Sequence, residues 1–349
     1  MIIYSRTQAD VRSAIGEMEA PIKMVIEYES DILANQNSVC NQLFNIEKSV
    51  HFAENIMGTQ ELRIFTPTSE GSSVESDTIY DKYVKYIEHI QFMKEFIISA
   101  QMMEDANFGI AVDAKRRAQN FTRAYYKTMN KLCEFVLING TKYFDKFEGT
   151  DVDTTSFDGY PLFYHKHTYG DDLQQSNYYG GDLVKSGTGS SRSYSEAAFE
   201  KALSKLSVIF RNIKDEQNCP LGYTADTIII PANRPELEMI VRKVCATQGA
   251  LGTNYNDVNL QYGNWNLVVL PSWQSDKDQL MIMSSEANKN LGGNLFFNRV
   301  PLTITNWVDH HTGNYIWNGR CRFGVGFGTY KHIMLVEDLE GESEKITAF

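Results

Sequence analysis

Hydrophobic residues recur at steps of three and four from residue 108 to residue 139, and this spacing predicts one long amphipathic helix. The pattern stops at Asn139 and Gly140, which is a favoured helix end. At about 1.5 Å per residue the helix would be about 45 Å long, more than most compact enzymes need. Its apolar face would consist of Ala111, Ala114, Ala118, Phe121, Tyr125, Met129, Leu132 and Val136.

A period of two replaces the helical period between residues 79 and 99. This stretch is rich in aromatic and β-branched residues, which favour strands. The segment 66–78 before it has no apolar face and is predicted to be an exposed loop. A polar tip followed by a long ribbon predicts a β-hairpin that reaches out from the body. The even-numbered apolar positions are Tyr80, Val84, Tyr86, Ile90, Phe92, Phe96 and Ile98.

The segments on either side of these elements are less regular. Residues 9–60 mix apolar positions with many charges and contain one proline, Pro21, so they are predicted to form an extended helical arm. Residues 141–192 are rich in Tyr, Gly, Asp and Ser and are predicted to be mostly loop.

A mixed subdomain of strands and helices is predicted between residues 193 and 300. Ser193 and Glu196 have the spacing of a capping box, and the apolar positions from Phe199 to Ile213 follow a helical period. Pro235 is placed near the first turn of a second helix. The short apolar runs 227–230, 265–270 and 279–283 are predicted to be strands.

The last long stretch, 301–336, is almost entirely strand-like. Within it Phe323, Val325 and Phe327 alternate with glycines, so one face of the strand carries bulk and the other carries none. We expect another segment to pack closely on the bare face. A nucleotide-binding loop is not indicated, because the glycines lack the Gly-x-Gly-x-x-Gly spacing and no helix follows them.

The composition adds a charge argument. The 349 residues carry 33 Lys and Arg against 44 Asp and Glu, a net charge of −11, so the chain has no general affinity for nucleic acid. The polar face of the long helix is nevertheless basic. It is either an ordinary solvated face or a surface that points inward toward phosphates or pairs with an acidic segment. Its members are Lys115, Arg116, Arg123, Lys127 and Lys131.

The beginning of the chain and its cysteines predict a non-exported protein. Arg6, Asp10 and Arg12 interrupt the place where a signal peptide would need an apolar run, and no stretch of the chain is apolar enough to span a membrane. The five cysteines are odd in number and contain no Cys-x-x-Cys pair. We expect reduced thiols in a cytoplasm rather than disulfides or a zinc site.

Catalytic motifs are missing. The chain has no Gly-x-Ser-x-Gly, His-Glu-x-x-His or Ser-x-x-Lys set, and no cofactor or metal is predicted. One metal-site alternative stays open, because imidazoles are frequent metal ligands. It would use His165, His167, His310 and His311.

Four patches of sequence follow one another in a characteristic order. They are residues 92–106 before the long helix; Asp158 to His167 with Asn177; 228–233 with 254–259 and 265–271; and 320–328. In this order they resemble the major capsid proteins of tailed bacteriophages, whose shell fold is named after phage Hong Kong ninety-seven, and among them the Mu-type major head subunits.

The resemblance implies an α+β fold with an N-terminal arm, an extended β-hairpin loop, a long spine helix domain and an axial domain. It also implies a non-enzymatic structural protein. The corresponding ranges would be 1–60 for the arm, 61–107 for the extended loop, 108–192 for the peripheral domain with the spine helix, 193–300 for the axial domain, and 301–349 for the closing strands and tail.

Such subunits assemble with copies of themselves into hexamers and pentamers of an icosahedral shell around double-stranded DNA. The resemblance therefore implies a virion protein assembled in the bacterial cytoplasm, with a portal and possible scaffold or decoration proteins as partners, non-specific DNA contact and no membrane. A projecting ribbon has unpaired edges that a neighbour must cover. We expect Tyr80, Tyr83, Tyr86 and Phe92 to bury against the adjacent subunit's spine region, and a deletion of 66–90 to prevent shell formation.

Two other functions are compatible with the sequence. An encapsulin-type nanocompartment has a related fold and would hold protein cargo, so particles with or without nucleic acid would separate it from a phage head. A metal-dependent enzyme built on the four histidines would carry near-stoichiometric metal.

Overall fold

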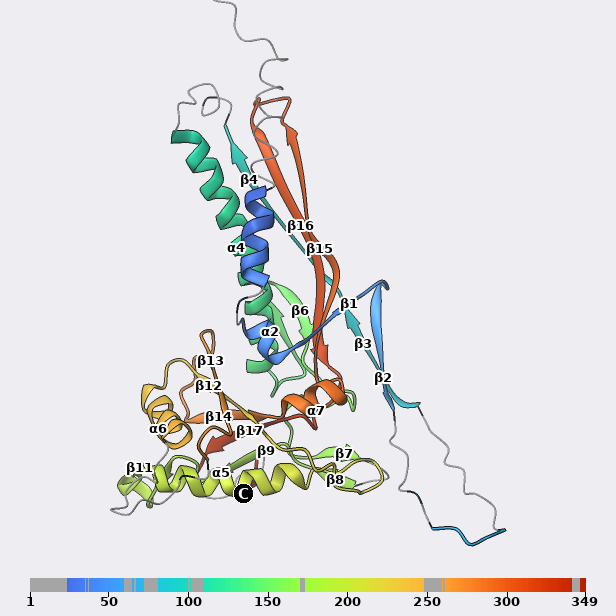
Figure 1. Ribbon diagram of the computed structural model, residues 1–349, viewed down its shortest axis with the longest axis vertical. Coiled ribbons are helices and arrows are strands. Elements are labelled where there is room, and N and C mark those ends of the chain that lie inside the picture. Colours follow the sequence, from blue (N-terminus) through green and yellow to red (C-terminus); the bar gives the residue numbers. More distant parts are fainter. Residues whose placement is uncertain are drawn as a thin grey trace, which may run out of the picture.

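The computed structural model has two parts (Figure 1). The upright part contains the long helix 109–138 and the long strands 294–308 and 315–327, and the lower part is built on a second sheet whose strands lie between residues 178 and 348. In the described part of the chain, no helix is long and apolar enough to cross a membrane. The described residues are 24–34, 36, 38–59, 65, 67–71, 81–99, 101, 109–169, 173–247, 259, 261–340 and 346–349.

A four-stranded sheet forms one layer of the upright part, in the order β1-β15-β16-β4. The strands β15 (Asn294–Val308) and β16 (Tyr315–Phe327) form a long antiparallel hairpin. Strand β1 (Asn45–Lys48) runs parallel to β15, and β4 (Ile90–Ile98) runs antiparallel to β16. Helix α4 (Gly109–Ile138) forms the second layer, beside this sheet (Figure 1).

The predicted long helix is confirmed within one residue at each end. Its apolar stripe faces the core, as its spacing requires. At the helix end, a Cβ on Gly140 would lie 2.9 Å from two ring carbons of Phe163, so the glycine lets the following loop pack against the helix. The fully or nearly buried side chains of the stripe are Ala118, Phe121, Met129, Leu132 and Val136.

The lower part is a six-stranded sheet in the order β13-β12-β14-β17-β9-β18, with two helices packed on one face. The predicted strands and helices of residues 196–283 are all present. The capping residue differs from the expectation: Ser195, not Ser193, accepts the Ala198 N–H. The elements are β9 (Tyr178–Gly181), α5 (Glu196–Arg211), β12 (Thr227–Pro231), α6 (Pro235–Ala246), β13 (Asn266–Leu270), β14 (Gln279–Met283), β17 (Ile333–Asp338) and β18 (Thr347–Ala348).

Alternate residues of this sheet divide between two cores, as the pleat of a strand dictates. Ile228 and Ile230 of β12 face α5 and α6, whereas Ile229 between them faces the core that contains the last turns of α4. Glu134 of α4 accepts the N–H of Ser272 at 2.9 Å, in the turn after β13. The upright and lower parts therefore share one continuous core at the base of the long helix.

Two of the expected segment limits fall inside elements that the structure keeps whole. Strand β15 crosses residue 300, so its first half continues the upright sheet rather than the axial segment. Strand β17 pairs with β14 and β9 in the lower sheet, although residues 301–349 were predicted to close the peripheral domain. Both limits differ from the expectation because β15 and β17 pair with strands that lie far away in the sequence.

The prediction of a helical arm through residue 60 is wrong for its last part. Helix covers residues 24–34 and α2 (Val39–Leu43), but β1 and β2 (Ala53–Thr59) follow. Strand β1 lies against β15, and β2 pairs with β3 (Asp81–Glu88). Residues 45–59 form strands rather than the expected helix, because both strands gain hydrogen-bonding partners that lie far away in the sequence.

Shorter elements complete the fold. They are β5 (Phe144–Phe147), β6 (Thr150–Asp153), β7 (His167–Tyr169), β8 (Leu173–Gln175), β10 (Lys185–Ser186), a 3-10 turn (Gly189–Ser191), β11 (Ser193–Tyr194) and α7 (Ser285–Asn290).

The bare glycine face of β16 is covered, as expected from the sequence. A Cβ on Gly324 would lie 2.8 Å from the carbonyl oxygen of Glu88, and one on Gly326 would lie 2.5 Å from Cδ1 of Ile87. The end of β3 thus sits directly on the backbone of β16, in space that the missing glycine side chains leave free.

A buried polar cluster joins the arm to the rest of the protein. Asn288 and Asn294 both donate to the carbonyl oxygen of Leu43, at 3.1 and 2.9 Å. His332 lies beside them with its Nε2 2.8 Å from Oδ1 of Asn294. Burial lowers the pKa of His332 to about 3, so this imidazole is neutral in the folded protein at neutral pH.

His332 should therefore make the fold sensitive to acid. The pKa of His332 is lower in the folded protein than in the unfolded chain, so protons bind preferentially to the unfolded chain as the pH falls. The folded state therefore has its full stability from this group above about pH 6.5 and loses it as the pH falls toward 3. The free energy of unfolding should decline by about 1.4 kcal/mol per pH unit from this group alone. We expect His332→Gln to reduce the slope of unfolding free energy against pH between pH 6 and 4 in denaturant titrations; an equal slope in both proteins would contradict this assignment.

Candidate functional site

The β2–β3 hairpin carries exposed apolar side chains, and in the described part of the chain these two strands form a sheet of their own. Val84 is 46% exposed and Tyr86 is 63% exposed, while the alternate residues Lys85 and Ile87 are buried. Phe52, in the turn before β2, is 76% exposed. A two-stranded ribbon with an apolar outer face is unstable in isolation and is a ready surface for another chain.

The root of the hairpin is held firmly by its own subunit. The ammonium of Lys85 donates to the carbonyl oxygen and, at 3.2 Å, to the hydroxyl of Thr155, and it lies 3.4 Å from Oδ2 of Asp153. Burial lowers the pKa of Lys85, and Asp153 partly opposes that shift. Ile87 packs with Leu295 and Phe297 of β15. The hairpin is therefore fixed at its base while its outer face is open.

The predicted single ribbon from 79 to 99 is two strands with opposite faces. In β3 the odd-numbered Lys85 and Ile87 point inward, whereas in β4 the even-numbered Phe92 and Phe96 point toward α4. The change occurs at His89, between the strands, where Nε2 lies 2.8 Å from the Ser49 hydroxyl. A shift of one residue exchanges the two faces of a strand, so one continuous alternation was the wrong interpretation.

This shift corrects part of the predicted interface. Phe92 stacks on Phe323 at 4.7 Å and meets Phe147 edge-on at 6.2 Å, so it belongs to the core of its own subunit. Tyr86 remains on the outer face. Tyr83 lies in β3, but its side chain and all of Tyr80 lie outside the described residues.

The arm helix, residues 24–34, lies along α4 (Figure 1). Ile26 enters a core cluster with Ile98, and the Ser30 and Tyr126 hydroxyls are 2.8 Å apart. The opposite side of the arm helix is apolar and open, with residues at steps of four. These residues are Met24, Tyr28 and Ile32, with exposed fractions of 71%, 65% and 42%.

The basic face of α4 is used in two ways. Arg123 Nε donates to Glu29 of the arm helix at 2.6 Å, and Lys131 pairs with Glu148 at 2.9 Å. Lys115, Arg116 and Lys127 are exposed. Arg123 thus pairs with an acidic residue of the arm, which is one of the predicted alternatives. Lys115, Arg116 and Lys127 place positive charge on the surface of the helix.

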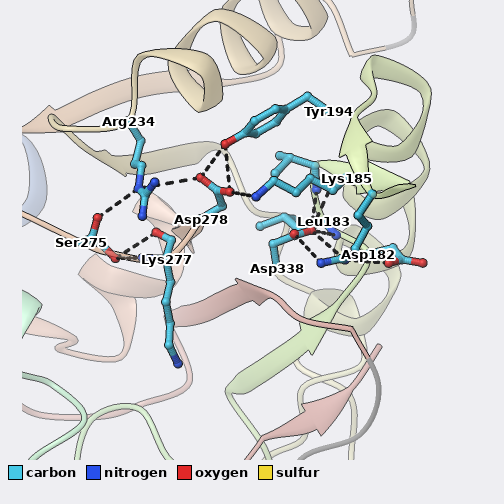
Figure 2. Close-up of polar contacts among 11 residues, drawn as sticks. Asp182, Leu183, Lys185, Tyr194, Arg234, Ser275, Lys277, Asp278 and Asp338 are labelled. Atoms are coloured by element: carbon cyan, nitrogen blue, oxygen red, sulfur yellow. Dashed lines mark hydrogen bonds and ion pairs between the residues drawn. The ribbon is translucent and has the colours of Figure 1, made fainter. Parts of the chain in front are cut away.

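A network of buried carboxylates fixes the segment 182–194 to the lower sheet (Figure 2). Asp278, before β14, accepts from the Tyr194 hydroxyl at 3.0 Å, forms an ion pair with Lys185, and lies 3.9 Å from Nε of Arg234. Burial, followed by Asp278, raises the pKa of Tyr194. Each charge in this group therefore has a partner of opposite sign or a hydrogen-bond donor.

Asp338, at the end of β17, forms the other half of the network. Its Oδ1 accepts the backbone N–H groups of Leu183 and Val184 at 2.9 and 3.1 Å, and its Oδ2 pairs with Arg192 at 2.9 Å. Carboxylates that accept several charge-assisted hydrogen bonds stabilise the loop they contact. The network therefore fixes the shape of the β10–β11 hairpin.

The four histidines are not brought together. His167 is fully buried, with Nδ1 2.6 Å from Asp158 and Nε2 3.1 Å from Asn177. His310 and His311 lie in the turn between β15 and β16, at the far end of the upright part from β7 (Figure 1). Among the residues that the structure describes, no three His, Cys, Asp or Glu side chains form a metal-binding group. The metal-site alternative therefore loses its geometric basis.

The Asp158 to Asn177 patch has a structural role. Asn177 Oδ1 accepts the Tyr164 N–H at 2.9 Å, and its amide nitrogen donates to carbonyl oxygens of Leu162 and Ile333 at 2.6 and 3.2 Å. The His167 ring stacks on Tyr330 at 3.8 Å. These contacts tie the loop region after α4 to β17.

The apolar stripe on the arm helix was missed by sequence reasoning as a candidate surface. Residues 9–60 were predicted to be helical, but the four-residue steps from Met24 to Tyr28 and Ile32 were not interpreted as an open face. The stripe alone did not distinguish an open face from a buried one, since Ile26 in the same helix is buried. Only the position of α4 decides which side of the arm helix is open.

Comparison with known proteins identifies the fold. No family model matches the chain, and no curated protein matches it. Among solved structures, the capsid of an empty GTA particle is 12% identical with a TM-score of 0.50, over 88% of this chain and 91% of that one. The capsid protein of cyanophage P-SCSP1u is 10% identical with a TM-score of 0.49, over 88% and 89%. The chain thus has a capsid-protein fold, in agreement with the resemblance that its sequence patches indicate.

Proposed function

We propose that this protein is the major capsid subunit of a tailed phage, and that its copies form the hexamers and pentamers of an icosahedral head around packaged double-stranded DNA. The observation that carries the proposal is the β2–β3 hairpin, which is anchored at its root by Lys85 and Ile87 and exposes Val84 and Tyr86 at its outer face. Such a ribbon gains its stability when a second copy covers it, and repeated heterologous contacts close into rings.

The complementary surface is the arm helix of a neighbouring copy. Met24, Tyr28 and Ile32 form an open apolar stripe on the spine helix layer, and Val84 and Tyr86 present apolar groups of similar size. Burial of such side chains contributes about 1.5–3 kcal/mol each. This pairing supports the expectation that the hairpin meets the neighbour's spine region, with Tyr86 in place of Phe92 as its aromatic contact.

The role is structural rather than enzymatic, and the protein would reside in the virion after assembly in the host cytoplasm. A portal and scaffold or decoration proteins would be further partners. DNA contact would be non-specific, because the net charge of −11 leaves only local basic groups such as Lys115 and Arg116 to meet phosphates.

Sedimentation and electron microscopy of the expressed protein test this function directly. We expect closed shells that enclose nucleic acid when they are taken from infected cells. Shells that enclose protein cargo and lack nucleic acid would favour the encapsulin-type alternative. A compact monomer at all concentrations would contradict both shell functions.

Arg123 should hold the arm helix on α4. Its partner Glu29 is almost fully buried, so Arg123→Gln leaves a buried carboxylate without its cation. Because Arg123 itself is more than half exposed, we expect a cost of only about 1 kcal/mol, or about fivefold faster amide hydrogen exchange in residues 24–34.

Lys127→Gln is the matched control, since Lys127 lies one turn further along α4 and is exposed. Exchange in the arm helix should not change in this variant. Equal acceleration in both variants would mean that general helix charge, and not the Arg123–Glu29 pair, holds the arm. Reversal of Arg116 and Lys127 to glutamate tests the surface charge separately, through the DNA content of assembled particles.

A further inference from the structure

The side-chain amide of Asn177 has an orientation that its neighbours fix. Its nitrogen donates to the carbonyl oxygens of Leu162 and Ile333 at 2.6 and 3.2 Å, and its oxygen accepts the N–H of Tyr164 at 2.9 Å. A rotated amide would turn its oxygen toward two carbonyl oxygens and its nitrogen toward an N–H group, so these hydrogen bonds would be lost. Oδ1 of Asn177 is therefore a hydrogen-bond acceptor in a fixed position.

Both ring nitrogens of the buried His167 face oxygen atoms that accept hydrogen bonds. Nε2 lies 3.1 Å from Oδ1 of Asn177 and 3.2 Å from the carbonyl oxygen of Leu162. Nδ1 lies 2.6 Å from Oδ2 of Asp158, whose side chain is as fully buried as that of His167. A neutral imidazole donates from one nitrogen only and would turn the lone pair of the other toward one of these oxygens. An imidazolium donates from both nitrogens.

We propose that His167 carries a proton on both ring nitrogens in the folded protein, and that this buried imidazolium joins Asp158 to Asn177 and so fixes the turn 155–161 at the root of the β2–β3 hairpin. An imidazole is ordinarily a stronger base than a carboxylate, so the shared proton resides on Nδ1. Oδ1 of Asp158 accepts the N–H of Tyr160 at 3.3 Å, and such a bond favours the carboxylate form. His167 is a positioning residue, because it acts on the hairpin through Asp158.

Aromatic rings surround His167 and favour a positive charge on it. The ring of His167 stacks on Tyr330 with 3.8 Å between the centroids and 5° between the planes. A cation is attracted to the face of an aromatic ring. Tyr160 and Tyr164 meet the imidazole edge-on, at 6.5 and 5.9 Å. Lys166, the residue before His167, is exposed and directs its charge to the surface.

The charged groups around the pair balance when His167 is protonated. Asp153 and Asp158 are two carboxylates, and the ammonium of Lys85 lies 3.4 Å from Asp153. Burial lowers the pKa of Lys85, and the charges of Asp153 and then Asp158 oppose that shift. Burial also lowers the pKa of the neighbouring His165, which is therefore neutral at neutral pH. One imidazolium thus gives two positive charges for two negative ones, as buried charges require.

The turn that carries Asp158 also holds the hairpin. Thr155, at its beginning, accepts hydrogen bonds from the ammonium of Lys85 in β3, and it forms a β-bridge with Pro161 at the end of the turn. Without the second proton on His167, the turn loses a charge-assisted bond, and Lys85 loses a fixed partner. The charge of His167 is independent of the proposed function, and only an effect on contacts between subunits rests on that function.

Solid-state nitrogen-15 NMR of the sedimented full-length chain, with labelled histidine, tests the proposal at pH 8, whether or not the chain forms shells. An exposed histidine is almost entirely neutral at this pH. We expect the signals of one ring with both nitrogens protonated among the seven histidines. Burial lowers the pKa of His332 to about 3, so this residue should give one protonated and one bare nitrogen. Spectra in which every ring is neutral would overturn the proposal.

Variants assign the signals and test the link to the hairpin. Asp158→Asn keeps the shape of the side chain but removes its charge. The doubly protonated signals should then disappear, and amide hydrogen exchange in residues 155–161 and in β3 should become about fivefold faster. His167→Gln should lose the same signals, so either variant suffices if the other fails to fold. His165→Gln is the control and should keep the signals and the wild-type exchange rates. Doubly protonated signals that persist without Asp158 or without His167 contradict the proposal, as does their loss in the control.

Discussion

Replacement of both Val84 and Tyr86 with aspartate should abolish shell formation while the subunit remains folded. Both side chains are exposed on the outer face of β3, so charge there costs the monomer little. In an assembled shell the same positions would bury two unpaired carboxylates, which costs several kcal/mol at each contact. We expect the fraction of protein that sediments as shells to fall at least tenfold, with the Tm of the isolated subunit within a few degrees of wild type.

The conservative pair Val84→Ile and Tyr86→Phe is the matched control, since it keeps an apolar surface of the same size. It should assemble at close to the wild-type yield. A normal yield of shells from the aspartate variant would remove the hairpin from the interface. The deletion of 66–90 that the sequence suggests is a poorer test, because it also removes Lys85, Ile87 and His89, which are buried in their own subunit.

Gly324→Ala should destabilise the subunit by about 1–3 kcal/mol, the usual range for an overpacked site. The added Cβ would lie 2.8 Å from the backbone oxygen of Glu88, which cannot move without displacing the end of β3. We expect a lower midpoint in urea unfolding and faster amide hydrogen exchange along β3, because the end of β3 no longer packs closely on β16.

Gly326→Ala provides the comparison on the same face of the same strand. The nearest atoms to its new Cβ would belong to the Ile87 side chain, with Cδ1 at 2.5 Å and Cγ1 at 2.9 Å, and a side chain yields more easily than backbone. We therefore expect a smaller loss of unfolding free energy than for Gly324→Ala. If the two variants lose equal stability, the rigid contact with the Glu88 carbonyl is not what makes glycine necessary in this strand.

The sequence predicted those features that depend on a local period. The apolar stripe of residues 108–139 marks α4 to within one residue at each end. The alternation of glycine with bulky residues in β16 predicted that another segment packs on the glycine face of this strand, and the end of β3 does so. Both predictions succeeded because a single continuous element displays its buried face through its own spacing.

Features that depend on distant pairing were missed or misplaced. Residues 45–59 were expected to be helical, but β1 and β2 obtain their hydrogen bonds from β15 and β3. Phe92 was assigned to a neighbour's surface, because the alternation around it ran through His89 without a visible break. The slip at His89 follows from how β3 and β4 pair with different partners, and no local pattern records that.

The sequence by itself determined the class of fold, the long helix and the presence of strands around it, because periodicity and the order of its patches are properties of the chain alone. Only the tertiary structure decided which sides of the hairpin and the arm helix are open, and that Arg123 is paired with Glu29. These outcomes require two segments to meet in space, and the free energy that selects such a meeting comes from packing over the whole molecule.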